Sequence, residues 1–238
     1  MAIGSRFVVA SIEARMTSTR LPGKVLLPCL GRPMLELMIE RVKRSRYLDA
    51  IVIATTTNGA DDPIVKLAEK LGVAYFRGSE FDVAGRVTSA MEQAKADVVV
   101  QLTSDCPLID PQIIDRYVRF YAANEFDHVS NVIVRSYPDG LDVQIASLPI
   151  LRRCYALCES DKDREHLFYP VRRNVDKIKT FHLIAPPELW WPQWRWTLDT
   201  PQDYELICRI YESLYPKNPA FLSKDIADFM LRHVDVTI

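Results

Sequence analysis

The fold is decided by a polar stretch near the N-terminus, Ala10-Ser-Ile-Glu-Ala-Arg-Met-Thr-Ser-Thr-Arg-Leu-Pro-Gly-Lys24. It follows the apolar run Phe7-Val8-Val9, so we expect it to leave the carboxyl end of a first strand. Its Pro22-Gly23 pair and the amphipathic run over residues 34–42 predict an extended loop followed by a helix. Open α/β sheets bind their ligands at such loops, beyond the carboxyl ends of the strands.

Downstream of this loop, strand patterns and helix patterns alternate as far as about residue 124. Short continuous apolar runs are typical of strands buried in a parallel sheet, and Asp61-Asp62-Pro63 is typical of a helix start. The expected strands cover residues 50–56, 73–76 and 97–103, and the expected helices cover 34–42, 61–72 and 82–94. The alternation predicts an α/β fold with a Rossmann-like, mostly parallel sheet flanked by helices.

The pattern changes after residue 127, where turn-forming residues separate shorter segments. Residues 128–135 and 141–147 flank the turn Tyr137-Pro138-Asp139-Gly140 and predict a small antiparallel insertion. Further expected elements are helices at 149–158, 164–174, 201–214 and 222–231, and strands at 177–184 and 194–198. We therefore expect one domain, residues 1–238, with boundaries between its parts near residues 127 and 185.

Composition excludes several classes of protein. Lys plus Arg number 30 and Asp plus Glu number 31, so the chain lacks the basic excess of a protein that binds nucleic acid along a broad face. No apolar run reaches the roughly 18 residues of a membrane span, and the N-terminus has no apolar signal region. We expect a cytoplasmic protein that binds neither nucleic acid nor membrane. The five cysteines include no Cys-x-x-Cys pair, which favours buried thiols over a zinc site.

Three cations, Arg15, Arg20 and Lys24, stand within ten residues of the loop. Guanidinium groups match phosphate oxygens bidentately and an ammonium acts as a point charge, so together they suit a triphosphate. A solvated surface loop is the alternative interpretation, because charged runs usually face water. The loop has neither the G-x-x-x-x-G-K-[ST] pattern of a P-loop nor a G-x-G-x-x-G pattern. Side chains and loop amides would therefore hold the phosphates.

Two aspartates follow expected strands. Asp105 comes after the strand at residues 97–103, on the edge of the sheet where the basic loop begins, and Asp199 follows the last expected strand. A carboxylate there can bind Mg²⁺, which prefers oxygen ligands from one or two carboxylates, phosphates and waters. The alternative is that these aspartates cap helices or turns. Asp110, before a proline, fits such a cap, and Asp203 fits the stabilisation of a first helical turn.

The loop pattern Arg-x-x-Ser-x-Arg-Leu-Pro-x-Lys, at residues 15–24, resembles the N-terminal signature of the cytidylyltransferases that activate acidic sugars. Nearly the whole chain is similar to the SpsF-type branch of that family, which acts in spore-coat polysaccharide synthesis. The resemblance implies a fold of the nucleotide-diphospho-sugar transferase type. It also implies a nucleotide-binding core (1–127), an insertion for acceptor binding and dimerisation (128–185), and a last part with the metal-binding strand and C-terminal helices (186–238).

The resemblance also implies a reaction and its residues. The reaction is the Mg²⁺-dependent transfer of CMP from CTP to a sugar acid or sugar phosphate, with release of pyrophosphate, by a homodimer in surface polysaccharide or glycoconjugate biosynthesis. Asp105 and Asp199 match the metal-binding aspartates of the family's T-G-D-x-P-L-like and L-D-T-x-x-D-like segments. The implied catalytic residues are Arg15, Lys24, Asp105 and Asp199; the implied nucleotide-binding residues are Ala10, Ser11, Ile12, Ala14, Arg15, Ser18, Arg20, Lys24, Gln101 and Ser104; and the implied acceptor-binding residues are Asn131, Asp142, Gln144, Arg164, Glu165 and His166.

The chain departs from the branch at three positions. Gln101 stands where the branch usually has Arg, Ser104 where it has Gly, and Gln144 where it has an acidic residue. The first two affect the geometry of the nucleotide site, and the third removes a charge from the acceptor site, which implies an unusual acceptor or a lower activity. The alternatives are a guanylyl- or other nucleotidyltransferase acting on a sugar 1-phosphate, a glycosyltransferase, and a non-catalytic homologue in the same pathway.

Overall fold

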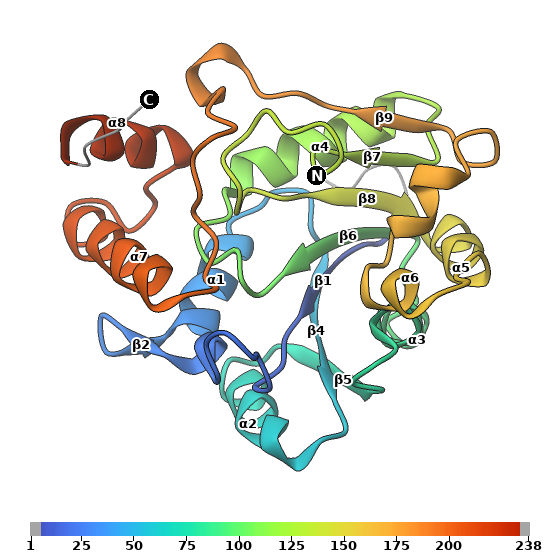
Figure 1. Ribbon diagram of the computed structural model, residues 1–238, viewed down its shortest axis with the longest axis horizontal. Coiled ribbons are helices and arrows are strands. Elements are labelled where there is room, and N and C mark those ends of the chain that lie inside the picture. Colours follow the sequence, from blue (N-terminus) through green and yellow to red (C-terminus); the bar gives the residue numbers. More distant parts are fainter. Residues whose placement is uncertain (1–5, 234–238) are drawn as a thin grey trace.

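The computed structural model describes residues 6–233, and a seven-stranded sheet runs through its centre (Figure 1). The strands are β1 (Val8–Glu13), β4 (Ala50–Thr56), β5 (Ala74–Gly78), β6 (Val98–Thr103), β7 (His128–Ser130), β8 (Gln144–Ser147) and β9 (Thr180–His182). Their order across the sheet is β5-β4-β1-β6-β8-β7-β9. The first four are parallel, β8 is antiparallel to both β6 and β7, and β9 is parallel to β7. The carboxyl ends of β1 and β6 therefore lie side by side at one edge.

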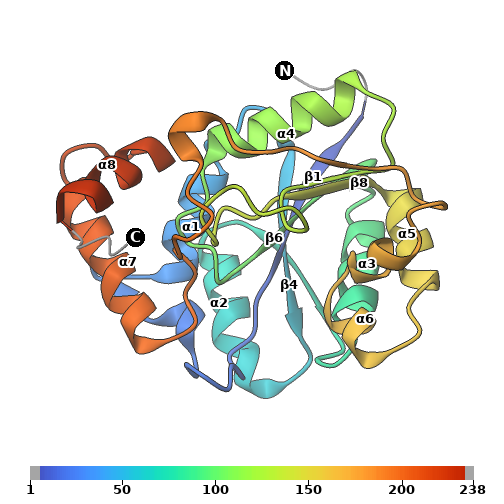
Figure 2. The same cartoon turned by 45° about the horizontal axis from the view of Figure 1, so that its top comes forward.

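Helices cover both faces of this sheet (Figure 2). They are α1 (Met34–Val42), α2 (Asp62–Lys70), α3 (Val83–Gln93), α4 (Pro111–Ala123), α5 (Leu148–Ala156), α6 (Asp161–Glu165), α7 (Pro201–Leu214) and α8 (Ser223–His233). α1, α2, α4, α7 and α8 share a core with Ile12 of β1, whereas α3 and α5 pack with Val9 on the opposite face. Because side chains alternate along a strand, Ser11 and Glu13 point to the same face as Val9.

Short elements complete the chain. β2 (Pro28–Cys29) and β3 (Arg32–Pro33) form a separate antiparallel pair. The 3-10 helices are η1 (Lys24–Leu26), η2 (Gly59–Asp61), η3 (Tyr169–Arg173) and η4 (Pro187–Leu189). No helix within residues 6–233 is long and apolar enough to cross a membrane.

Most of the predicted elements are confirmed. α1 and β4 have the predicted bounds, and β7 and β8 form the predicted antiparallel pair within the main sheet. Asp110 caps α4 by accepting a hydrogen bond from the backbone N–H of Gln112 at 2.7 Å. Asp203 stabilises the start of α7, because it forms a reciprocal capping box with Thr200.

The first strand is longer than predicted. It runs to Glu13, so the predicted loop residues Ala10, Ser11 and Ile12 lie inside β1 and are fully buried. The polar side chains of Ser11 and Glu13 make the sequence resemble a loop from residue 10 onward, because a polar run usually marks a loop. Both belong instead to a strand that has neighbours on both sides, β4 and β6, which bind its backbone groups.

Two predicted elements in the second half of the chain are wrong. The helix expected at 164–174 is divided between the end of α6 and η3, since Pro170 lacks the N–H that a continuous helix needs. Residues 194–198 form a single bridge, Asp139 with Arg195, rather than a strand. Their alternating burial resembles a strand, but their backbone groups bind loops around Asp139 and Asp105. The strands of the insertion are also shorter than predicted, at 128–130, 144–147 and 180–182.

Candidate functional site

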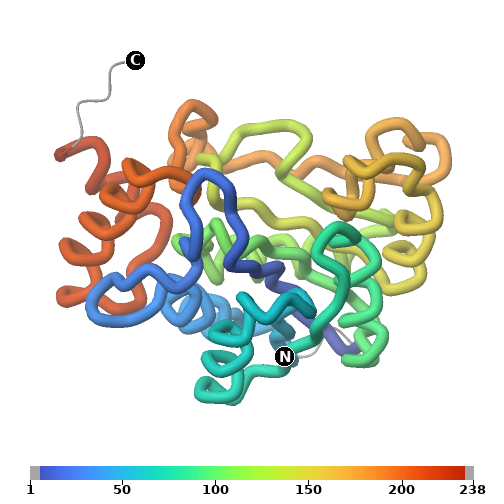
Figure 3. The backbone as a smooth tube through the Cα atoms, turned by 60° about the horizontal axis from the view of Figure 1, so that its bottom comes forward, coloured from blue at the N-terminus to red at the C-terminus, as the bar shows by residue number. Residues whose placement is uncertain are grey.

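The basic loop, residues 14–24, arches from the carboxyl end of β1 toward the segment that leads into α7 (Figure 3). Two contacts fix its shape. The N–H of Met16 donates to Oδ1 of Asp61 at 2.7 Å, and the N–H of Gly23 donates to the carbonyl oxygen of Met16 at 2.9 Å. Gly23 has a φ of 69°, which a residue without Cβ adopts at little cost. Asp61 stands at the predicted helix start, but its buried carboxylate binds the loop and Thr56.

Lys24, at the end of the basic loop, brings together the two aspartates that the sequence predicts as metal ligands. Its Nζ lies 2.7 Å from Oδ1 of Asp199 and 3.7 Å from Oδ2 of Asp105. Asp105 follows β6 and accepts a hydrogen bond from Oγ1 of Thr103 at 2.5 Å. It caps no helix, because Asp110 caps the helix that follows. Its carboxylate is therefore available for a ligand.

Asp199 is surrounded by three cations. Besides Lys24, Nη2 of Arg20 lies 3.1 Å from Oδ2, and Nη2 of Arg195 lies 2.5 Å from the same oxygen. Burial alone would raise the pKa of Asp199, but the hydrogen bonds and charges of these cations outweigh it and hold the pKa below its usual value. Asp199 is thus a carboxylate at neutral pH, although its side chain is only 9% exposed.

The segment that carries Asp199 is positioned by its backbone. The N–H of Leu198 donates to the carbonyl oxygen of Asp105 at 2.7 Å, which ties the two aspartate segments together. Gly140 packs so closely on Trp196 that a Cβ at residue 140 would lie 2.6 Å from the backbone carbon of Trp196. Residues 6–233 contain no cluster of three or more His, Cys, Asp or Glu side chains that could hold a metal ion, so any ion here would rely on these two carboxylates and a ligand.

Two cavities adjoin at this edge of the sheet. The first, which we call the loop cavity, has a volume of about 330 Å³ and is lined by Glu13, Ala14, Arg15, Ser18, Thr19, Arg20, Lys24, Val83, Arg86, Thr103, Ser104, Asp105, Glu165, His166 and Asp199. The second cavity has a volume of about 310 Å³ and lies between the sheet and the segment from α6 to η3. Four residues line both: Glu13, Thr103, Glu165 and His166. A ligand in one cavity would therefore face a ligand in the other.

Comparison with known proteins decides the family. A family model described as cytidylyltransferase matches residues 9–189. The chain belongs to the cytidylyltransferase family. A solved cytidylyltransferase from Leptospira borgpetersenii has a TM-score of 0.90 and 33% identity, covering 95% of this chain and 94% of its own.

Two relatives with curated names cover most of this cytidylyltransferase. The spore coat polysaccharide biosynthesis protein SpsF of Bacillus subtilis is 33% identical over 84% of this chain and 85% of its own length. A 3-deoxy-manno-octulosonate cytidylyltransferase of Anaeromyxobacter dehalogenans is 30% identical over 77% of this chain and 80% of its own length. The family and the SpsF-type branch that the loop motif predicts are therefore confirmed.

The predicted nucleotide-binding residues of this cytidylyltransferase do not all reach the loop cavity. Those that line it are Ala14, Arg15, Ser18, Arg20, Lys24 and Ser104, together with both aspartates. Ala10, Ser11 and Ile12 have no exposed surface to offer a nucleotide. Gln101 points to the second cavity.

The predicted acceptor-binding residues divide in the same way. Asp142, Gln144, Glu165 and His166 line the second cavity. Asn131 is buried, and its side-chain amide is hydrogen-bonded to the backbone of residues 141 and 143. It therefore stabilises the insertion and does not contact the cavity. Arg164 turns away, toward Asp82 at 3.3 Å and the ring of Tyr155. Its place on a one-turn helix, rather than in the long helix expected from the sequence, gives it this direction.

The structure also disfavours a glycosyltransferase. An Asp-x-Asp triplet occurs at Asp161-Lys162-Asp163, where a metal motif of that class could stand. Asp163 is instead buried in the capping box of α6 and paired with Arg173 at 2.6 Å. Its carboxylate oxygens are occupied by the protein itself.

Glu13 is a site residue that the sequence motifs do not predict. It lies at the end of β1 and lines both cavities. Nε2 of Gln101 donates to both of its carboxylate oxygens at 2.9 Å. Burial raises the pKa of Glu13 to about 7, and the hydrogen bond from Gln101 and the charge of Arg86 oppose that rise only in part. The signal in the sequence is the spacing of two from Val9 through Ser11 to Glu13, which places Glu13 on the face of Gln101 once the strand is extended.

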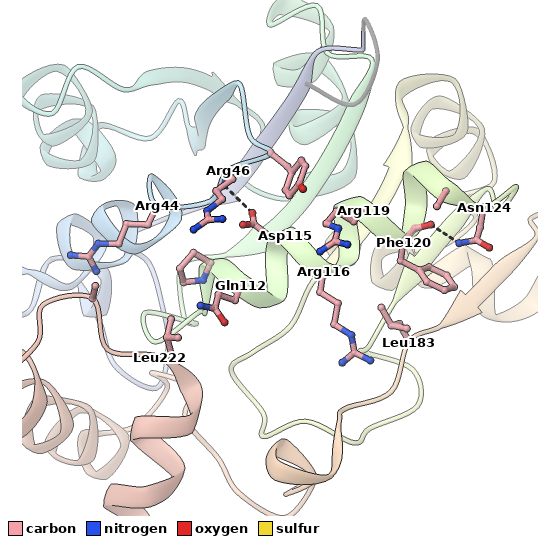
Figure 4. A pocket seen from close by; sticks show the side chains of 14 residues that line it. Arg44, Arg46, Gln112, Asp115, Arg116, Arg119, Phe120, Asn124, Leu183 and Leu222 are labelled. Carbon is pink, nitrogen blue, oxygen red and sulfur yellow. Dashed lines mark hydrogen bonds between the residues drawn. The ribbon is translucent and has the colours of Figure 1, made fainter. Parts of the chain in front are cut away.

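A larger cavity, of about 850 Å³, lies along α4 and shares no lining residue with the other two (Figure 4). Arginines from α4 and from the segment after α1 surround it. Asp115 is the one carboxylate among its lining residues, and it accepts hydrogen bonds from Ser45 and Arg46. With no pair of carboxylates for a metal ion, this cavity lacks the chemistry for nucleotidyl transfer.

Proposed function

We propose that this cytidylyltransferase transfers CMP from CTP to a sugar acid, with release of pyrophosphate, in the biosynthesis of a surface polysaccharide. The observation that carries the proposal is the junction of the two cavities at Glu13 and His166. A nucleotide under the basic loop would present its α-phosphate to an acceptor in the second cavity. The relatives named for polysaccharide biosynthesis and for 3-deoxy-manno-octulosonate support the choice of a sugar acid.

The charges of the loop cavity suit a triphosphate. Arg20 and Lys24 both converge on Asp199, and Lys24 also lies 3.7 Å from Asp105, so the loop places two cations beside the carboxylates where the phosphates would lie. Arg15, which lies 3.8 Å from Glu80, adds a further guanidinium on the same side. In the proposed reaction the acceptor hydroxyl attacks the α-phosphorus and loses its proton to water. The new P–O bond forms as the bond from the α-phosphorus to the bridging oxygen breaks, and pyrophosphate leaves with that oxygen. The loop cations hold the phosphates in line and neutralise the charge that develops on the leaving group.

The same carboxylates fit the Mg²⁺ that the sequence predicts. The ammonium of Lys24 lies between Asp105 and Asp199, so the space between the carboxylates already accommodates a cation. The two aspartates would hold Mg²⁺, which would neutralise charge on the α-phosphate when bound. The homodimer, the cytoplasmic location and the division of the chain near residues 127 and 185 stay predictions.

The test measures pyrophosphate release from CTP and 3-deoxy-manno-octulosonate with Mg²⁺, and compares Lys24→Ala with Lys70→Ala. Lys70 is an exposed lysine paired with Glu36 at 3.5 Å, remote from both cavities, so it controls for the loss of a lysine. We expect turnover in the wild type and in Lys70→Ala, and a loss of about 100-fold or more in Lys24→Ala. Release with GTP, ATP or UTP in place of CTP, or equal rates in the two variants, would overturn the proposal.

A further inference from the structure

Two exposed cations that no motif contains, Lys162 and Arg172, line the second cavity. Nζ of Lys162, in α6, lies 4.7 Å from the ring centre of Tyr169, and the guanidinium carbon of Arg172, in η3, lies 5.3 Å from the same ring. Both positive charges therefore lie near the ring of Tyr169.

These two cations differ from their neighbours in the same segment. Arg164 is paired with Asp82, and Arg173 is paired with Asp163 and with Glu159. Within residues 6–233, neither Lys162 nor Arg172 has a carboxylate within 4.0 Å. Two cations without an anionic partner, both near the ring of Tyr169 and both lining the cavity, form a place for an anion.

The sheet side of the second cavity has the opposite character. A row of hydrogen-bonded side chains crosses four strands, and we call it the polar row: Ser130, Gln144, Gln101 and Glu13. Oγ of Ser130 donates to Gln144 at 3.3 Å, Nε2 of Gln144 donates to Gln101 at 2.6 Å, and Gln101 donates to Glu13. Every donor points toward Glu13, so the row ends in an acceptor.

This end of the row suits hydroxyl groups better than acids. A carboxylate accepts about four hydrogen bonds, and Gln101 supplies two contacts to Glu13, which leaves acceptor positions toward the cavity. Asp142 adds a second carboxylate to the same side of the cavity, where it is paired with Arg135 at 3.0 Å. An acidic group of a ligand would meet acidic side chains here, whereas Lys162 and Arg172 are the lysine and the arginine among the residues that line the cavity.

We propose that the second cavity binds a polyhydroxylated acid in one orientation, with its carboxylate between Lys162 and Arg172 and its hydroxylated chain on Glu13 and the polar row. The inference rests on the proposed function and adds to it the orientation of the acceptor and the residues that set it. The cations of the basic loop are taken up by the triphosphate, so the acceptor's acid group needs cations of its own. The ring of His166 lies 6.2 Å from that of Tyr169 and lines both cavities, so the hydroxyl on the carbon next to the acceptor's carboxylate would face the loop cavity beside His166. A volume of about 310 Å³ suits a single sugar.

The experiment compares the wild type with the double variant Lys162→Ala/Arg172→Ala. The matched control is Lys179→Ala, since Lys179 also lies over an aromatic ring, 5.1 Å from the centre of Phe126, but outside both cavities. The acceptors are 3-deoxy-manno-octulosonate and its analogue in which the carboxylate is reduced to a primary alcohol. In the wild type and the control we expect the acid to be preferred over the alcohol. In the double variant we expect KM for the acid to rise about 10- to 100-fold and that preference to disappear, with KM for CTP unchanged. A retained preference for the acid would overturn the orientation.

Direct titration separates this inference from the proposed function. The wild type and the double variant, each saturated with CTP in the presence of EDTA, are titrated with 3-deoxy-manno-octulosonate by calorimetry. Binding that weakens in the double variant supports the orientation, and if the wild type then releases no pyrophosphate with Mg²⁺, the proposed function fails while the orientation holds. Equal binding by both proteins, or no binding by the wild type, refutes the orientation.

Discussion

Replacing Glu13 with glutamine tests whether the carboxyl at the end of the polar row resists ionisation. Burial raises its pKa from an ordinary 4.5 to about 7 in the folded protein. Below pH 4.5 the carboxyl is protonated in both the folded and the unfolded chain. Between pH 4.5 and 7 it ionises only in the unfolded chain, so the contribution of Glu13 to the free energy of unfolding falls as pH rises, and the loss is complete above pH 7.

The linkage relation gives the size of the effect. For a pKa of about 7 in the folded protein and 4.5 in the unfolded chain, ionisation of Glu13 lowers the free energy of unfolding by about 2.5 kcal/mol between pH 5 and pH 8. The carboxyl borders two cavities that admit water, so this value is an upper limit. Glutamine keeps an acceptor for Gln101 and does not titrate. Glu13→Gln should therefore gain stability relative to the wild type as pH rises from 5 to 8.

Urea unfolding of both proteins at pH 5, 6, 7 and 8, without nucleotide or metal ion, measures the effect. The test compares the free energy of unfolding of Glu13→Gln with that of the wild type at each pH. The titration of all other groups contributes equally to both proteins and cancels in the difference. We expect that difference to move by about 1 to 2.5 kcal/mol in favour of the variant. A difference that stays constant within about 0.5 kcal/mol from pH 5 to pH 8 would show that Glu13 ionises normally, and would refute the burial argument.

Three further predictions concern the site and its support. Asp199→Asn should lower kcat by about 100-fold or more in the pyrophosphate assay. Asp203→Asn should chiefly lower Tm, through loss of about 1 kcal/mol of helix capping. Equal kcat values for the two variants would show that Asp199 has no special role in the reaction. Gly140→Ala places a Cβ 2.6 Å from the backbone of Trp196, at a φ of 111°, and should lower the free energy of unfolding in urea by about 2 kcal/mol or more. An unchanged urea midpoint would contradict the close packing. Burial lowers the pKa of His128 from 6.5 to about 3, so acidification through that range should lower the free energy of unfolding by up to about 5 kcal/mol. In His128→Leu the free energy of unfolding should depend less steeply on pH. The same pH dependence in the variant and the wild type would show that His128 is not buried in its neutral form.

The parts of the fold that the sequence predicts well depend on local chemistry. The start of α7 follows from Thr200, Pro201 and Asp203, because a capping box and a proline in the first turn are formed by residues close in sequence. β4 follows from a continuous apolar run between turn-forming residues. The residues of the basic loop themselves predict a phosphate site. The approach of the loop to Asp199 is implied by the resemblance to the family and not by any local pattern.

The parts that the sequence misses depend on contacts between distant segments. Residues 194–198 alternate buried and exposed side chains, as a strand does, yet their backbone partners are loops around Asp139 and Asp105. Arg164 has a place in the family motif, but the direction of its side chain is set by Asp82, 82 residues earlier. Glu13 becomes a site residue only because β1 pairs with β6. The register of that pair brings Gln101 within hydrogen-bonding distance of the Glu13 carboxylate. Periodicity along one segment contains no information about such pairs.

The register also changes the interpretation of two departures from the SpsF-type branch. Gln101 and Gln144 are paired across β6 and β8, and Nε2 of one donates to Oε1 of the other at 2.6 Å. An arginine and an acid at these two positions would place opposite charges next to each other, so their replacement by two amides is a single, matched change. The hydrogen bonding of the row stays complete, and its negative charge lies at Glu13 alone. An arginine at 101 would instead pair with Glu13 and favour its ionised form. The amide pair therefore favours altered acceptor recognition over loss of activity, because both positions changed together in a way that keeps their side chains hydrogen-bonded.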